Sequence, residues 1–143
     1  MTNKIVIFGT LSALNEYSNA QRKNKYLGAK IKAENTERCA YYVQQAMKKG
    51  VVFHFPCRLK FTWYCPNKRK DPDNIASAKK FILDGMQEAG FIDNDNWNTM
   101  SDGFIDVFKL DKEKPRIEIE EVKCDEDIFN TTRKIDIKTN CDE

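Results

Sequence analysis

A chain of 143 residues is long enough for one domain with a hydrophobic core, and a second independent core is not expected. Its content of 41% hydrophobic and 11% aromatic residues argues against a wholly disordered protein, and no apolar run approaches the roughly 20 residues that span a bilayer. The N-terminus carries no signal-peptide pattern, so we expect a cytoplasmic protein that does not associate with a membrane.

The first half of the chain predicts a strand, a long helix and a second strand. Residues 4–10 contain a short apolar run typical of a strand, whereas residues 11–25 are polar and indicate a loop that enters a helix. We expect this helix over residues 26–49, with Gly50 ending it. Residues 51–64 follow as a strand, because apolar and polar side chains alternate after Pro56, which is expected to bend its beginning.

The second half predicts one helix and two strands. Asp73 or Asn74 can cap a helix that runs to about Ala89. A loop is expected over residues 93–98, followed by strands over 103–110 and 116–122 that a hairpin at 112–115 joins. The order βαβαββ predicts an α+β fold, with a small mixed β-sheet and two helices packed on it. We expect one domain over residues 1–123, with residues 124–143 as an acidic tail or a peripheral strand.

The cysteines and the single histidine point away from disulfides and zinc. The five cysteines are odd in number and form no Cys-x-x-Cys pair, and His54 is the one histidine. We therefore expect reduced thiols that bind no metal.

Charge is distributed unevenly along the chain. Residues 1–80 carry 16 Lys and Arg against 5 Asp and Glu, whereas residues 81–143 carry 8 against 17. A basic half can bind a polyanion by neutralising its phosphates, although solvated helix faces account for such charges as readily.

The strongest motif is the sequence Lys68-Arg69-Lys70-Asp71-Pro72-Asp73-Asn74. Three cations precede two carboxylates spaced i, i+2, and Pro72 favours an extended Asp71, so that both carboxylates can face one point. Two convergent carboxylates repel each other unless a cation lies between them, and Mg²⁺ prefers such oxygen ligands. A charged turn that ends in a helix cap is the alternative interpretation.

Two further groups can join this motif. Asp95 can approach Asp73 only if the chain after Gly90 turns back along the helix, and Asp93 is a competing candidate. Lys80 lies seven residues after Asp73 on the same helical face, where it can reach a scissile phosphate or simply pair with Asp84.

Together these residues resemble the RusA family of Holliday junction resolvases. The resemblance covers residues 68–97: the basic run, Asp71-Pro72-Asp73-Asn74, Lys80 to Asp84, Gly85-Met86, Ala89-Gly90-Phe91 and Asn94-Asp95. A weaker likeness covers Leu14-Asn15-Glu16-Tyr17 and the basic residues that follow. One departure is the three additional residues before Lys80, which leave Lys79 as a second candidate for the family's essential lysine.

The resemblance implies a homodimeric, magnesium-dependent crossover junction endodeoxyribonuclease that acts in DNA recombination and repair. Asp71, Asp73 and Asp95 would hold Mg²⁺, with Mn²⁺ as a substitute, and Lys80 would be the fourth catalytic residue. A two-fold symmetric junction calls for two equivalent sites, which a dimer supplies. The residues expected to contact DNA are Asn15, Arg22, Lys23, Lys25, Lys30, Lys68, Arg69 and Lys70. Lys32 extends the same basic helix start. A nuclease for flap or other branched DNA and a non-catalytic DNA-binding protein remain as alternatives.

Overall fold

The computed structural model describes residues 3–101 and 103–122, apart from the side chains of Leu14 and Asn15. The expected tail over residues 124–143 therefore lies outside the described residues. Nine elements follow in chain order: β1 (Lys4–Phe8), α1 (Leu14–Lys23), α2 (Lys25–Lys48), β2 (Arg58–Cys65), α3 (Pro72–Ala76), α4 (Lys79–Glu88), α5 (Trp97–Met100), β3 (Phe104–Leu110) and β4 (Arg116–Val122).

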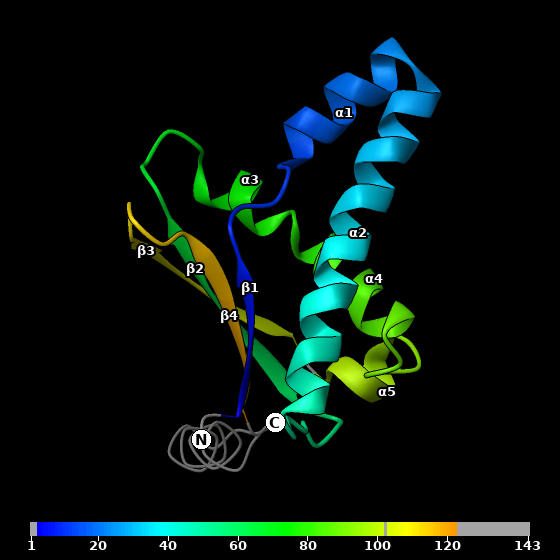
Figure 1. Cartoon of the computed structure of the whole chain (residues 1–143), viewed down its shortest axis with the longest axis vertical. Helices are drawn as coiled ribbons and strands as arrows, with labels where there is room; N and C mark the ends of the chain where they lie inside the picture. The colour runs from blue at the N-terminus through cyan, green and yellow to red at the C-terminus, as the bar shows by residue number, and fades with distance from the viewer. Residues whose placement is uncertain (1–2, 102, 123–143) are drawn as a thin grey trace, which may run out of the picture.

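The α+β class is confirmed. A four-stranded mixed sheet has the order β1-β4-β2-β3, and the helices lie against one of its faces (Figure 1). The strands β1 and β4 pair antiparallel, as do β2 and β4, whereas β2 and β3 are parallel. The strands follow in the predicted order, and α2 matches the helix expected over residues 26–49 to within one residue at each end. The helix expected from Asp73 to about Ala89 is divided into α3 and α4, and the loop expected over residues 93–98 is corrected at its end, where α5 begins at Trp97. No helix within the two described ranges is both long and apolar enough to cross a bilayer.

The hairpin predicted at residues 112–115 is wrong. Strand β2 lies between β3 and β4, so these two strands do not pair with each other. The link between them passes the end of β2, where the Asp111 amide donates to the Cys65 carbonyl at 2.8 Å. Because α3 and α4 lie between the parallel strands β2 and β3, this part of the chain is a β-α-β crossover.

The loop predicted over residues 11–25 is wrong as well, because most of this segment forms the helix α1. The Ala13 amide donates to the Glu16 carboxylate at 2.6 Å, which satisfies one of the free amides at the helix start. The helix packs along α2, where a side chain at Gly28 would overlap the Cγ of Gln21 at 2.6 Å. The strand predicted over residues 51–64 is shorter than expected: β2 begins at Arg58, so residues 51–57 are not part of it.

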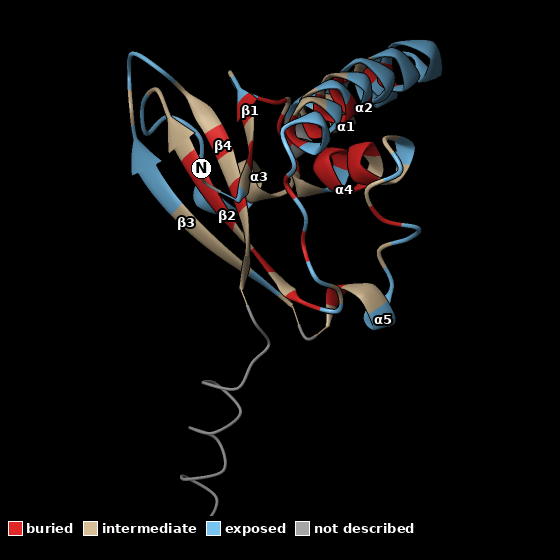
Figure 2. Cartoon of the chain, turned by 60° about the horizontal axis from the view of Figure 1, so that its bottom comes forward, coloured by how far each residue is buried: buried red, intermediate tan, exposed pale blue. Residues whose placement is uncertain are grey.

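The core lies between the sheet and the helices α2 and α4 (Figure 2). The alternating side chains Ile5, Ile7, Ile117 and Ile119 are fully or almost fully buried on this face of the sheet, and β2 adds Leu59, Phe61 and Trp63. Alternation predicted this face correctly because each strand presents every second side chain to the helices. The free thiols of Cys39 and Cys57 lie in this core, and burial raises the pKa of Cys39 to about 12.

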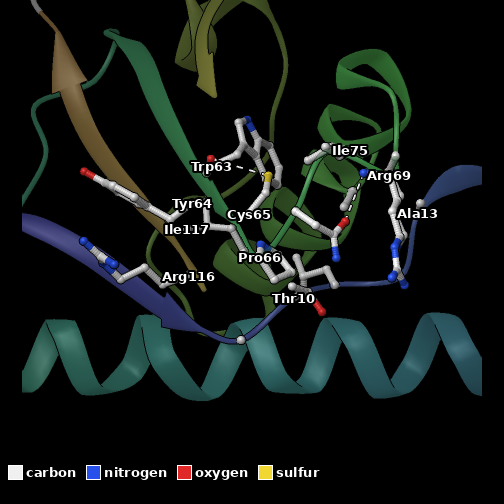
Figure 3. A pocket seen from close by; sticks show the side chains of 15 residues that line it. Thr10, Ala13, Trp63, Tyr64, Cys65, Pro66, Arg69, Ile75, Arg116 and Ile117 are labelled. Carbon is white, nitrogen blue, oxygen red and sulfur yellow. Dashed lines mark hydrogen bonds between the residues drawn. The ribbon is translucent and has the colours of Figure 1, made fainter. Parts of the chain in front are cut away.

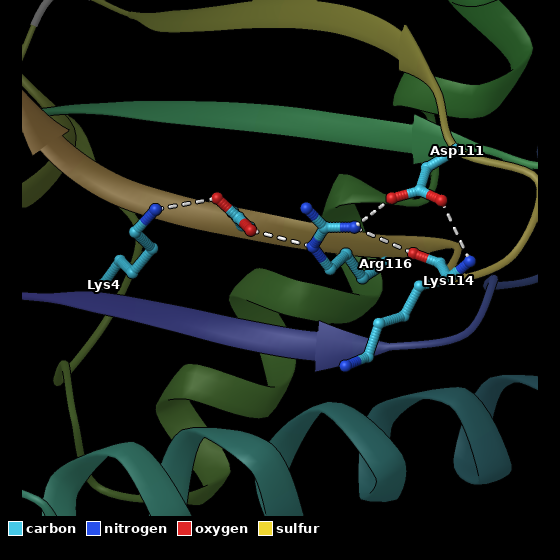
Figure 4. A network of polar contacts seen from close by, with 5 residues as sticks. Lys4, Asp111, Lys114 and Arg116 are labelled. Carbon is cyan, nitrogen blue, oxygen red and sulfur yellow. Dashed lines mark hydrogen bonds and ion pairs between the residues drawn. The ribbon is translucent and has the colours of Figure 1, made fainter. Parts of the chain in front are cut away.

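A polar network covers the opposite face of the sheet (Figure 4). The Glu118 carboxylate accepts hydrogen bonds from Lys4 Nζ and Arg116 Nε, both at 2.8 Å. The Arg116 guanidinium also contacts Asp111 at 2.8 Å and lies 3.8 Å from the centre of the Tyr64 ring. The network therefore links β1, β4 and the loop that follows β3.

Candidate functional site

The two carboxylates of the Asp-Pro-Asp motif lie at the start of α3. Asp71 has an extended backbone (φ −71°, ψ 149°) and occupies the N-cap position, with Pro72 as the first helical residue. This corrects the expectation that Asp73 or Asn74 caps the helix, since the fixed φ of Pro72 suits the first turn and begins the helix two residues earlier. Asp71 makes no side-chain capping bond, and both Asp71 and Asp73 are exposed.

The helix predicted over residues 73–89 is divided at Ser77 and Ala78. The Ser77 hydroxyl donates to the Asn74 carbonyl at 2.5 Å, and α4 begins two residues later at Lys79. The division separates the exposed Asp71 and Asp73 from a second helix whose apolar face is buried against α2. It also places Lys79 and Lys80 at the start of α4, where they point to different surroundings.

Lys80 lies between two carboxylates. Its Nζ is 3.3 Å from Asp84 Oδ1 and 3.7 Å from Asp95 Oδ2. Partial burial lowers the pKa of Lys80, but the hydrogen bond and charge of Asp84, together with the charge of Asp95, outweigh it, so that the pKa lies above its ordinary value. At neutral pH this ammonium is therefore a fixed positive charge and a poor proton donor.

Lys79 faces the sheet instead. Its Nζ is 2.7 Å from Asp106 Oδ2 on β3 and lies 4.6 Å from the centre of the Phe104 ring. The Trp63 indole donates to the other Asp106 oxygen at 2.9 Å. Because Lys79 is held in this partly buried group, Lys80 is the better placed of the two lysines to meet a ligand near Asp95.

The chain after α4 turns back toward the start of that helix. The amides of Phe91 and Ile92 both donate to the Met86 carbonyl, and the Phe91 ring packs against Phe53 and Phe55. Ile92 is buried, which anchors the loop so that Asp95 reaches Lys80. The competing candidate, Asp93, is exposed in the same loop.

The structure brings the predicted site together only in part. Asp95 meets Lys80, but no group of three or more His, Cys, Asp or Glu side chains within residues 3–101 and 103–122 is arranged to hold a metal ion. The donor chemistry still suits magnesium, because all three predicted ligands are carboxylates at the surface or in part exposed, and Mg²⁺ commonly binds through one or two carboxylates and keeps several waters. The grouping of Asp71, Asp73 and Asp95 around one ion stays a prediction.

The predicted DNA-binding side chains form two groups. Arg22, Lys23, Lys25 and Lys30 are exposed where α1 meets α2, at the end of the helical pair that extends beyond the sheet (Figure 1). The side chain of Asn15 lies outside the part of the structure that is described. The other group, Lys68, Arg69 and Lys70, is exposed in the loop before α3.

A contact between Lys70 and Glu16 connects the second group to α1. The Lys70 Nζ lies 3.2 Å from Glu16 Oε1. Partial burial raises the pKa of Glu16, but the Ala13 amide and Lys70 outweigh it, so that the pKa is lowered. Through this contact, the base of the extended helical pair is attached to the loop that carries the Asp-Pro-Asp motif.

The sequence did not single out Asp106 or Trp97. Asp106 lies on the inward-facing side of β3, between Phe104 and Phe108, and a charged residue in an aromatic alternation is the signal that could have found it. Trp97 lies two residues after Asp95 and is 85% exposed. Nothing in the neighbouring sequence predicts that this tryptophan lies at the surface. No protein-family model and no curated protein matches the chain.

Proposed function

We propose that the protein is a magnesium-dependent endodeoxyribonuclease that resolves four-way DNA junctions as a homodimer. The observation that carries the proposal is the contact between Lys80 and Asp95, because it attaches the Asp95 loop to the helix that follows the Asp-Pro-Asp motif. The exposed carboxylates of Asp71 and Asp73 at the start of α3 and the basic loop before them support it. The resemblance to RusA resolvases supplies the substrate.

Each group has a defined part in the proposed reaction. Asp71, Asp73 and Asp95 would hold Mg²⁺. The ion would polarise the phosphodiester and lower the pKa of a bound water. Lys80 stays protonated and stabilises the negative charge that develops on the scissile phosphate. Lys68, Arg69, Lys70 and the cations at the end of the α1–α2 pair hold backbone phosphates, which positions DNA without reading its sequence.

The test is cleavage of a labelled synthetic four-way junction in the presence of Mg²⁺, with duplex and flap DNA in parallel. We expect paired symmetric nicks in the junction from the wild type, a loss of at least about 100-fold in rate for D73N and D95N, and near-normal cleavage by D93N as the matched control in the Asp95 loop. Cleavage that survives D73N and D95N would remove the proposed site. Sedimentation equilibrium of the wild type tests the homodimer.

A non-catalytic DNA-binding protein is the second candidate, and one observation favours it. The described residues contain no ready group of three metal-ligating side chains, while the side chains of both basic groups are exposed. This candidate predicts tight, salt-sensitive junction binding with no cleavage in Mg²⁺ or Mn²⁺. Preferential cleavage of flaps over junctions would instead favour the related nuclease for other branched DNA.

A further inference from the structure

A cavity of about 250 Å³ lies beside the Asp-Pro-Asp motif and has no part in the proposed cleavage reaction. Its lining comes from the loop after β1, the end of β2 with the loop that follows it, α3, the residue before α4 and the start of β4 (Figure 3). Leu11, Trp63, Pro66 and Ile75 give it apolar walls. Its volume is slightly below the range of about 300–1,000 Å³ that is typical of pockets for drug-sized ligands, so it suits a small ring system.

The charged residues that line this cavity are of one sign. Among the described residues that line it, Arg69, Lys70 and Arg116 are cations and none is Asp or Glu. Arg116 is engaged by Asp111 and Glu118, and Lys70 contacts Glu16. Within the described part of the chain the Arg69 guanidinium makes no hydrogen bond or ion pair, and only the backbone amide of Arg69 is engaged, by the side chain of Asn67. An anionic group at the rim would therefore find an available partner in Arg69.

Polar groups accompany the apolar walls. Thr10 and Asn67 are exposed at the cavity and carry a hydroxyl and an amide, which can donate to and accept from a heterocycle. An apolar cavity with an aromatic wall, a few hydrogen-bonding side chains and a cation at the rim matches a planar base joined to a phosphate. The cavity and the motif are adjacent because Arg69 precedes Asp71 by two residues and Ile75 follows Asp73 by two.

We propose that this cavity binds one unstacked nucleobase of the DNA, with the phosphate of the same nucleotide at Arg69. The DNA ligand rests on the proposed function, whereas the cavity itself does not. A base at a branch point is easier to unstack than one within a continuous duplex, because the stacking of the arms is interrupted there. Binding of a particular base would give the enzyme a sequence preference near the bond that it cuts.

The test uses the two tryptophans as reporters, in EDTA, so that neither metal nor cleavage is involved. Trp63 lines the cavity and Trp97 lies elsewhere, so the ¹H–¹⁵N spectrum holds two indole signals that W97F assigns. We expect deoxyadenosine or deoxycytidine monophosphate to shift the Trp63 signal saturably and to leave that of Trp97 in place. Deoxyribose 5-phosphate, which lacks the base, should leave both unchanged.

Variants complete the test. R69Q should raise the apparent Kd of the mononucleotide about tenfold, whereas K49Q, which removes an exposed cation at the end of α2, should not change it. The bulkier side chains of T10Y or C65F, whichever variant keeps the wild-type spectrum, should abolish the shift by occupying the cavity.

The outcomes separate the two proposals. An equal shift from deoxyribose 5-phosphate, or no shift of Trp63 by either mononucleotide, overturns base binding. A saturable Trp63 shift in a protein that cleaves no junction supports the cavity and contradicts the proposed nuclease. Junction cleavage without that shift does the reverse.

Discussion

Two neighbouring lysines at the start of α4 have opposite roles because their side chains leave the helix in different directions. Lys79 is 16% exposed and pairs with Asp106, which also accepts a hydrogen bond from Trp63. Lys80 is 64% exposed and faces Asp84 and Asp95. Removing one partner of a partly buried pair is destabilising because it leaves the other charge unpaired, whereas an exposed pair contributes little to stability. The first lysine therefore belongs to the fold, and the second is available to a ligand.

The substitution K79Q is expected to lower the free energy of unfolding by about 1–2 kcal/mol, because Asp106 would lose its charged partner inside the structure. K80Q should leave stability close to that of the wild type and abolish junction cleavage. Urea denaturation of both variants measures the first effect, and the junction assay the second. Equal stability of the two variants would contradict the assignment of Lys79 to the fold.

The carboxyl group of Glu118 makes stability depend on pH. Partial burial raises its pKa, but the hydrogen bonds from Lys4 and Arg116 outweigh burial, so the folded-state pKa lies below the ordinary 4.5. A lowered pKa means that the stabilisation is present above about pH 4.5 and is lost as the pH falls through the folded-state value. We expect E118Q to be less stable than wild type at pH 7 and to lose less stability below pH 4.5. Thermal denaturation across pH 3–7 would show it, and parallel curves for the two proteins would contradict it.

At the level of elements, the crossing of α2 and α4 depends on Gly85. A Cβ at this position would lie 2.6 Å from the Cβ of Cys39 and 2.8 Å from the backbone nitrogen of Ala40, and a helix backbone cannot give way as a flexible side chain can. G85A is therefore expected to lower the free energy of unfolding by about 1–3 kcal/mol. E88A, at an exposed position of the same helix, is the control in urea denaturation. Comparable stability of the two variants would show that the helices separate without cost.

Elements with a regular pattern were predictable from the sequence, and elements fixed by distant contacts were not. Strand β4 follows the expected range because Ile117 and Ile119 alternate with charged residues. The strands that pair with β4 could not be predicted. Because β3 and β4 are consecutive and joined by a short link, the sequence favours a hairpin between them, whereas β2 lies between them in the sheet. In the site, the sequence supplied Lys80 and Asp95, and their contact depends on how the buried Ile92 anchors the returning loop.

At the level of the whole molecule, one group of basic side chains lies away from the sheet. The α1–α2 pair extends beyond the sheet and carries basic side chains at its end, while Lys70 and Glu16 attach its base to the loop before α3 (Figure 1). A DNA arm held against this pair would contact the motif loop as well. Phosphate contacts at the end of the pair would then hold the arm, while the exposed carboxylates of Asp71 and Asp73 lie near the phosphodiester bond to be cut.

The salt dependence of junction binding tests this arrangement without requiring cleavage. Replacing Arg22, Lys23 and Lys25 by glutamine removes three exposed cations, so the slope of log K against log salt concentration should decrease by about 2–3, because each neutralised phosphate contributes about 0.9. The matched control replaces Lys48, Lys49 and Lys112, which are also exposed but lie at the other end of α2 and in the β3–β4 link. Fluorescence anisotropy with a labelled junction between 50 and 200 mM salt gives both slopes. If the control decreases the slope as much as the first variant, binding follows net charge alone and the extended helical pair has no special part in it.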